Sequence, residues 1–148
     1  MTVKPEVLIV ELVMSIDRMI ESAKLANPPV GEWNASTLLG HVSQVDLQVW
    51  LPRVEMMLAA QSANEAEPSF TFWEPDPIET ARTFGSMNIE DAAGGALQAR
   101  TKLVTFLSTL TANQWDARAN HATFGSMDVR DLIFKALTHD EEHRASLL

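Results

Sequence analysis

The sequence contains no cysteine. This absence excludes disulfide bonds, metal sites built from thiolates and a thiol nucleophile supplied by the protein itself. A reactive thiol would have to arrive with a substrate. Basic residues are also few, since 11 Lys and Arg stand against 20 Asp and Glu and the formal net charge is −9. Because an acidic surface repels phosphate backbones and anionic lipids, the composition disfavours binding to nucleic acid or to a membrane surface.

Long apolar segments are absent as well. The apolar run near the N-terminus is interrupted by Glu11, and it has no small-residue cleavage pattern and no span of about 18 apolar residues. We therefore expect a cytoplasmic protein. The contents of 46% hydrophobic and 21% charged residues are ordinary for a globular chain, and a length of 148 residues suits one domain with one core.

Apolar residues that recur every three or four positions predict four helices. The helices are expected at about residues 6–26, 35–61, 89–110 and 128–147. Asn34 is a candidate N-cap for the second helix, and Asp128 with Asp131 forms a candidate capping box for the fourth. Pro52 lacks a backbone N–H, so we expect the second helix to kink there or to break into two helices.

Two segments interrupt the helical pattern. Residues 61–88 contain three prolines, yet their aromatic side chains are too numerous for a free linker. We therefore expect a long crossover that packs its aromatics onto the helices. Residues 120–126 are predicted to form a loop around Gly125, with His121 as a loop residue. The whole chain, residues 1–148, is predicted to be a single all-α domain, a four-helix bundle.

Three histidines lie on the apolar stripes of the predicted helices. His139 and His143 are four residues apart, so their Cβ atoms are about 6 Å apart on one face of the fourth helix. His41 lies near the start of the second helix. At about 1.5 Å of rise per residue, it is level with the pair only if these two helices are antiparallel. A long crossover between helices two and three produces that arrangement, so we predict an up-down-down-up topology.

The three histidines suggest a metal site. Three neutral imidazoles without a thiolate suit zinc, nickel or iron(II), with coordination positions left open for water or substrate. We therefore predict that His41, His139 and His143 bind a divalent metal, with zinc or nickel favoured and iron as an alternative. Three ordinary core histidines are the competing interpretation.

Two other residues near the predicted site have ordinary explanations. Glu142 is a candidate fourth ligand, or an acceptor for one of the histidines, but acidic residues between the pair more commonly face solvent. Arg100 lies on the apolar stripe of the third helix. We expect it to pair with an acidic residue at the edge of the bundle rather than to bind substrate.

Several short motifs occur in order along the chain. They are Trp33, Leu39-Gly40-His41, Trp50-Leu51-Pro52-Arg53, Trp115, Phe124-Gly125 and His139-Asp140-Glu141-Glu142-His143. Together, from about residue 7 to the end, they resemble the DinB-like superfamily, which includes thiol-dependent transferases and maleylpyruvate isomerases. The resemblance implies a four-helix bundle with an unusual connection, a divalent metal held by the three histidines, and a homodimer.

The resemblance also implies a class of chemistry. Relatives of this kind use the metal to activate a low-molecular-weight thiol such as bacillithiol or mycothiol. We therefore expect a thiol transferase or a metal-dependent hydrolase, acting on a small-molecule thiol or an electrophilic substrate. No general base is identified. The alternative is a non-catalytic helical binding or stress-response protein that holds a structural metal or none.

Overall fold

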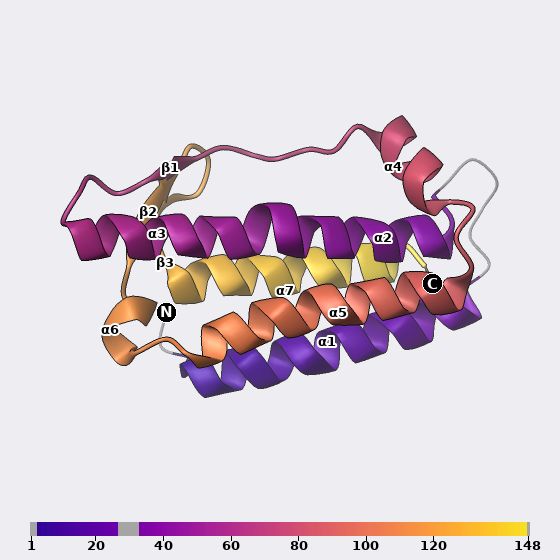
Figure 1. Ribbon diagram of the computed structural model, residues 1–148, viewed down its shortest axis with the longest axis horizontal. Coiled ribbons are helices and arrows are strands. Elements are labelled where there is room, and N and C mark those ends of the chain that lie inside the picture. Colours follow the sequence, from indigo (N-terminus) through magenta and orange to yellow (C-terminus); the bar gives the residue numbers. More distant parts are fainter. Residues whose placement is uncertain (1–2, 27–32, 148) are drawn as a thin grey trace.

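The computed structural model describes residues 3–26 and 33–147, and its main feature is a bundle of long helical segments packed side by side (Figure 1). The segments are α1 (Pro5–Leu25), the continuous run of α2 (Ala35–Val45), η1 (Asp46–Trp50) and α3 (Leu51–Ala63), then α5 (Ile89–Ser108) and α7 (Val129–Ala145). A short helix, α6 (Ala112–Trp115), follows α5. The predicted all-α four-helix bundle is confirmed.

The helical segments do not simply alternate in direction. In Figure 1, α1 and α7 run from left to right, whereas the α2–α3 run and α5 run from right to left. This is an up-down-down-up order. As a result α2 and α7 are antiparallel, and the beginning of α2 lies level with the end of α7.

The second segment contains a π-helical turn, η1, immediately before Pro52. The backbone N–H of Leu51 donates to the carbonyl of Asp46, five residues earlier. Pro52 has no N–H of its own, and a wider turn is a common way for a helix to accommodate such an irregularity. The helix therefore does not break at Pro52 but continues as α3 as far as Ala63.

The crossover between α3 and α5 is more ordered than the sequence suggested. It contains the short strand β1 (Ser69–Phe70) and the helix α4 (Pro77–Phe84), which packs against α2. A Cβ atom at Gly40 would come within 2.1 Å of the Phe84 ring, so this close approach requires glycine. The predicted packing of aromatic side chains onto the bundle is observed at Phe84 and at the buried Phe70.

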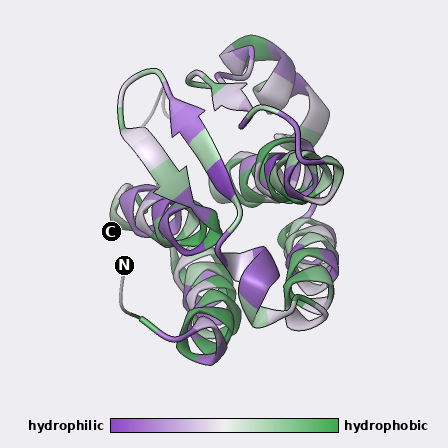
Figure 2. Ribbon diagram, turned by 90° about the vertical axis from the view of Figure 1, so that its left-hand side faces the viewer, coloured by the Kyte–Doolittle hydropathy of each residue, from purple (hydrophilic) through white to green (hydrophobic). Residues whose placement is uncertain are grey.

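The segment 120–126, which was expected to be a loop, instead belongs to a β-hairpin and contains its turn together with the adjoining ends of both strands. Strands β2 (Arg118–His121) and β3 (Gly125–Asp128) are antiparallel, and β1 adds to β2 in parallel. Figure 2 looks along the bundle from this end, and the strands of the small sheet are visible beside the ends of the helices. The prediction failed because each strand has only four residues, too few to display an alternating pattern.

A charged network crosses the interior of the bundle. The guanidinium of Arg100 on α5 donates to both carboxylate oxygens of Asp46 and to both of Asp140, at 2.8–3.2 Å. It also donates to the carbonyl of Leu12, and the hydroxyl of Ser15 donates to Asp140. The prediction that Arg100 pairs with an acidic residue is correct, but the predicted location of the pair at the edge of the bundle is wrong. Arg100 is 1% exposed and lies at the centre of the bundle.

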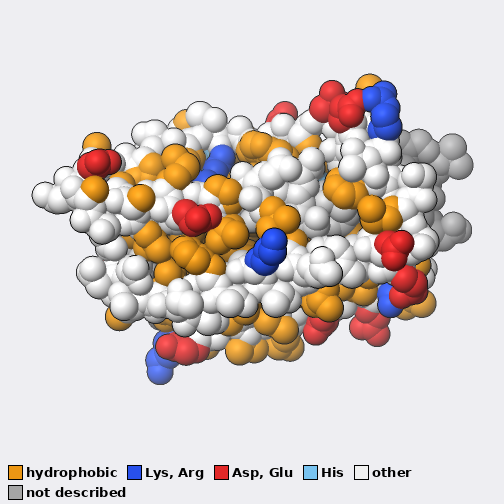
Figure 3. Space-filling view, viewed as in Figure 1, with side chains coloured by type: hydrophobic (Ala, Val, Ile, Leu, Met, Phe, Trp, Pro, Cys, Tyr) orange, Lys and Arg blue, Asp and Glu red, His pale blue; other side chains and the backbone are white. Residues whose placement is uncertain are grey.

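The outer surface mixes apolar and charged side chains. On the face seen in Figure 3, hydrophobic side chains gather over the left half, where α3 lies, with few charged groups among them. Met56 on α3 is 51% exposed, whereas its neighbour Met57 is fully buried. Among the helices of residues 3–26 and 33–147, none is both long and apolar enough to cross a membrane.

Candidate metal centre

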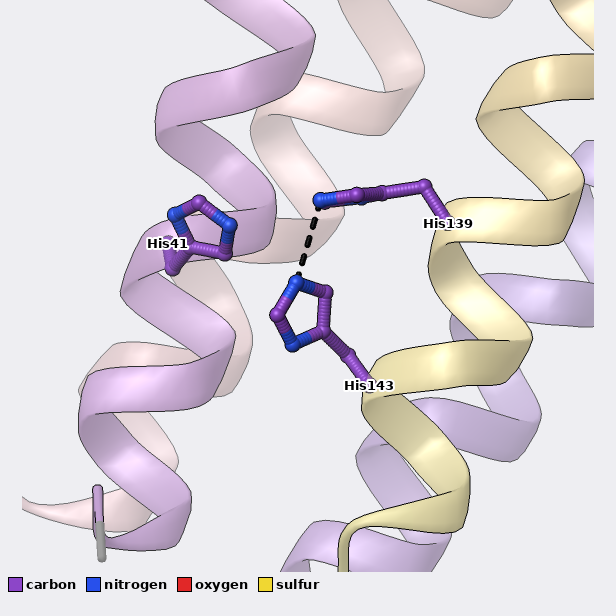
Figure 4. A group of neighbouring side chains, drawn as sticks. All are labelled: His41, His139 and His143. Atoms are coloured by element: carbon purple, nitrogen blue, oxygen red, sulfur yellow. Dashed lines mark hydrogen bonds between the residues drawn. The ribbon is translucent and has the colours of Figure 1, made fainter. Parts of the chain in front are cut away.

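The bundle brings the three predicted histidines together. His41 projects from α2, and His139 and His143 project from α7, with all three rings pointing toward one another (Figure 4). The ring centroid of His41 lies 5.3 Å from that of His139 and 4.7 Å from that of His143. One ring nitrogen from each residue lies within 4.8 Å of the other two. Side chains almost 100 positions apart in sequence thus form one cluster.

The cluster is held in place by both helices and by the charged network. The side chain of Asn34 accepts from the N–H of Thr37 and caps α2 seven residues before His41. Asp128 and Asp131 form the predicted capping box of α7. Asp140, next to His139, is 1% exposed and is anchored by Arg100 and Ser15. The sequence placed Asp140 in solvent, and its burial is a correction.

Burial makes the three imidazoles hard to protonate. Loss of solvent, and then the proximity of His143, lower the pKa of His41 from 6.5 to about 4, with a smaller opposite effect of Gln44. Burial, followed by His143 and His41, lowers the pKa of His139 to about 3. Burial also lowers the pKa of His143, against the nearby negative charges of Asp140 and Glu142. All three rings are therefore neutral near pH 7, which is the state that binds metals.

The arrangement of ring nitrogens fits a divalent metal. The Nε2 atoms of His139 and His143 are 3.0 Å apart. Two nitrogens bound to one tetrahedral zinc at about 2.1 Å would be about 3.4 Å apart, so little movement is needed. The Nδ1 atom of His41 is buried and has no hydrogen-bond partner among the described residues. A donor set of three neutral imidazoles, with one nitrogen unsatisfied, suits zinc, nickel or iron(II).

Aromatic rings surround the histidines. The ring centroid of Trp33 lies 5.1 Å from that of His41, and Trp73 stacks on His41 at 6.4 Å. Trp50 meets His139 edge-on at 6.0 Å. Packing against these rings helps to explain why His41 is only 4% exposed.

The cluster lies beside a cavity of about 460 Å³, whose wall includes Trp50 and Trp73. His41 and His139 line one part of it, together with the exposed Glu142. Glu142 was predicted either to face solvent or to assist the metal, and its position at the cavity allows both. The cavity extends toward the small sheet, where His121 lines its wall.

His121 lines the cavity although its sequence context predicted only a loop residue. It is 6% exposed, lies in β2, and its Nδ1 atom accepts from the backbone N–H groups of Thr123 and Phe124. Its neutral ring therefore carries its proton on Nε2. A hairpin turn around Gly125 was the available signal, because a Gly in the left-handed region, here with φ 76°, is typical of such turns.

Two solved structures have the same fold. One is YfiT from Bacillus subtilis, which is described as a probable metal-dependent hydrolase with an unusual four-helix bundle topology. It superposes with a TM-score of 0.74 at 13% sequence identity, and the comparison covers 97% of this chain and 83% of YfiT. A variant of the mycothiol-dependent maleylpyruvate isomerase superposes with a TM-score of 0.68 at 10% identity. That comparison covers 98% of this chain but 61% of the isomerase.

The two structures are too distant in sequence to establish more than the fold. A search of curated protein sequences gave no match. The family model of the DinB superfamily, in contrast, matches residues 11–147, which include all three clustered histidines and nearly the whole bundle. On this match, the chain belongs to the DinB superfamily.

Proposed function

We propose that His41, His139 and His143 bind a divalent metal, and that the protein is a metal-dependent enzyme acting on a small molecule in the adjoining cavity. The observation that carries this proposal is the convergence of three ring nitrogens within 4.8 Å at the wall of a cavity of about 460 Å³. Structural zinc is usually enclosed by four protein ligands, whereas catalytic sites keep a position open. A cluster of three histidines beside a cavity is typical of the second kind.

The chain's own residues define what such a site can do. The buried histidines stay neutral at pH 7 and so present free electron pairs without first losing a proton. The tryptophans around them exclude bulk water. A bound divalent metal would lower the pKa of a water molecule or of a thiol placed beside it. The protein has no cysteine, so a thiol would have to come from a second substrate.

Two reactions agree with this site, a thiol transfer and a hydrolysis. A thiol cofactor of the bacillithiol or mycothiol type is supported by the fold shared with a mycothiol-dependent isomerase. Hydrolysis is supported by the fold shared with a probable metal-dependent hydrolase. Zinc and nickel are the favoured metals, since imidazole suits both, and iron is the alternative. The cytoplasmic location and the homodimer remain predictions, the second of which size-exclusion chromatography with light scattering would test.

Elemental analysis of protein purified without a histidine tag tests the proposal. We expect about one equivalent of zinc, nickel or iron per chain, and its loss in His139→Ala and in His143→Ala. The matched control is His121→Ala, which removes a histidine outside the cluster and should keep the metal. Absence of metal from the parent protein, even after incubation with each ion in turn, would overturn the proposal.

A further inference from the structure

The cavity beside the histidines contains two basic side chains with no acidic partner. Most basic residues of this chain pair with a carboxylate, as Arg100 and Arg130 do. Arg53 and Lys135 both line the cavity, and neither has a carboxylate within 4.0 Å in the described part of the chain. Two unpaired cations in one cavity are unexpected in a protein with a net charge of −9.

Both side chains are held in position by other contacts. The Nη2 atom of Arg53 donates to the carbonyl of Thr71 at 2.6 Å, and its guanidinium lies 4.8 Å from the centre of the Phe70 ring. The ammonium of Lys135 lies 3.7 Å from the centre of the Phe124 ring. These contacts order the two side chains without neutralising them. Burial without a carboxylate partner lowers the pKa of Arg53, which an anion would reverse.

Two other residues that line the cavity carry hydrogen-bond donors. Trp50 is 9% exposed and lines the cavity, and its indole nitrogen has no partner among the described residues. His121 also lines the cavity, and because its Nδ1 atom already accepts two hydrogen bonds, its Nε2 atom is a donor. The Nε2 donor of His121 would be satisfied by a ligand that carries acceptor oxygen atoms.

The remaining wall is largely apolar. It includes side chains from both helices and from the sheet, among them Val45, Val49, Met127 and Leu132. Phe72 and Phe124 contact His121 at the same end, with ring centroids 5.0 and 4.6 Å away. A volume of about 460 Å³ is within the usual range for small-molecule sites. The cavity is therefore suited to an apolar or aromatic body with one charged end.

The cations lie on one side of the histidine cluster. Lys135 precedes His139 by four residues, about 6 Å along α7. Arg53 follows His41 along the antiparallel α2–α3 run, so it extends in the same direction from the cluster as Lys135 does. The acidic residues that line the cavity, Glu74 and Glu142, are both exposed to solvent. The cavity is thus positive toward the sheet, away from the histidines.

We propose that the cavity binds a small molecule with a carboxylate at one end and an apolar body, the carboxylate lying at Arg53 and Lys135 and the body extending toward the three histidines. This inference rests on the proposed function, because it names the substrate class of the same site. The carboxylate can belong to the electrophilic substrate or to a thiol cofactor, since both would present the same oxygen atoms to the cations.

Binding measurements on protein freed of metal with a chelator test the inference, because no metal can then hold the ligand. The first probe is 4-phenylbutyrate, compared with its uncharged amide. The second is N-acetylcysteine, compared with its amide. Isothermal titration calorimetry measures the affinity. We expect at least one acid to bind about three- to tenfold more tightly than its amide, as a partly exposed charged hydrogen bond implies.

Variants assign the effect to the two cations. Arg53→Gln and Lys135→Gln should each remove most of the preference for the acid and leave the amide unchanged, whereas Arg53→Lys should retain part of it. Lys102→Gln, an exposed lysine on α5 outside the cavity, is the matched control. Preference for 4-phenylbutyrate alone assigns the carboxylate to the electrophile, and preference for N-acetylcysteine alone assigns it to the thiol.

The inference is overturned if neither acid is preferred to its amide, or if the preference survives both glutamine variants. This failure is separable from failure of the metal proposal. Metal content and the preference for the acid are measured separately on the parent protein, so either result can fail while the other holds. A parent protein that binds zinc but shows no preference would refute only the carboxylate site.

Discussion

Replacing Arg100 tests the charged network at the centre of the bundle. Arg100→Met retains an unbranched side chain but removes the guanidinium that both Asp46 and Asp140 accept from. All three side chains are 1% exposed, so water cannot replace the lost donors without opening the core. Breaking a buried pair and leaving its charge uncompensated costs about 3–5 kcal/mol. The free energy of unfolding of a native protein is about 5–15 kcal/mol, so this loss would be a large fraction of the total stability.

The loss of stability in Arg100→Met should depend on pH. Burial already raises the pKa of Asp46, because one guanidinium faces two carboxylates and only partly offsets the loss of solvent. Without Arg100 this pKa should rise further. When the pKa of a carboxyl group is higher in the folded state than in the unfolded state, the folded state binds the proton more tightly. Ionisation of that group therefore destabilises the fold as pH rises. The free-energy difference between parent and variant should therefore be greatest near pH 7–8 and shrink toward about pH 4.

Urea unfolding followed by circular dichroism measures the effect. With a slope of about 2 kcal/mol per M, the midpoint of Arg100→Met should fall by roughly 2 M at pH 7.5. Arg118→Met, which removes an exposed pair with Glu67, should cost less than about 1 kcal/mol. Converting Asp46 and Asp140 to Leu as well should recover most of the stability, as apolar replacements of buried charges do. A pH-independent loss below 1 kcal/mol would refute the reasoning.

Two further predictions concern stability. Metal-free protein should lose stability as pH falls from about 6.5 through about 4. The folded-state pKa values of His41 and His139 are lowered to about 4 and about 3, so the unfolded chain takes up protons first. A thermal-melting midpoint that stays constant over this pH range would contradict those pKa values. Gly40→Ala should destabilise by about 1–3 kcal/mol in urea titrations, because its Cβ would lie within 2.1 Å of the Phe84 ring. The matched control Gly94→Ala, where no atom lies within 4 Å, should stabilise α5 by about 0.5–1 kcal/mol, and equal effects at the two sites would contradict the packing.

Local sequence signals predicted the helices well. Apolar spacing marked α1, α5 and α7 closely, since residues that repeat every three or four positions can form one buried face only as a helix. The capping side chains Asn34 and Asp128 were correctly identified because an N-cap needs only its own helix. The π-helical turn before Pro52 was not predicted, since a kink, a break and a wider turn all accommodate a missing N–H.

The burial and pairing of polar side chains were predicted less well, because they depend on residues far away in the sequence. Asp140 lies between two histidines on a helix and resembles a solvent-facing acid, yet it is buried because Arg100 lies 40 positions away in sequence and faces it. His121 could not be placed at the cavity because its strand is short and pairs with a strand from the crossover. Nothing in the sequence around Arg53 or Lys135 indicates that the two side chains line the same cavity.

The sequence by itself determined the helices and identified three histidines as candidate metal ligands, because apolar periodicity, capping and imidazole chemistry are local properties. The length of the crossover even indicated which helices would be antiparallel. Only the tertiary structure decided which polar groups are paired, which are buried and which face a common cavity. Those outcomes depend on the solvent and charge around each side chain, and segments from the whole chain supply both. The same residue type therefore becomes a core ion pair at Arg100 and an unpaired cation in a cavity at Arg53.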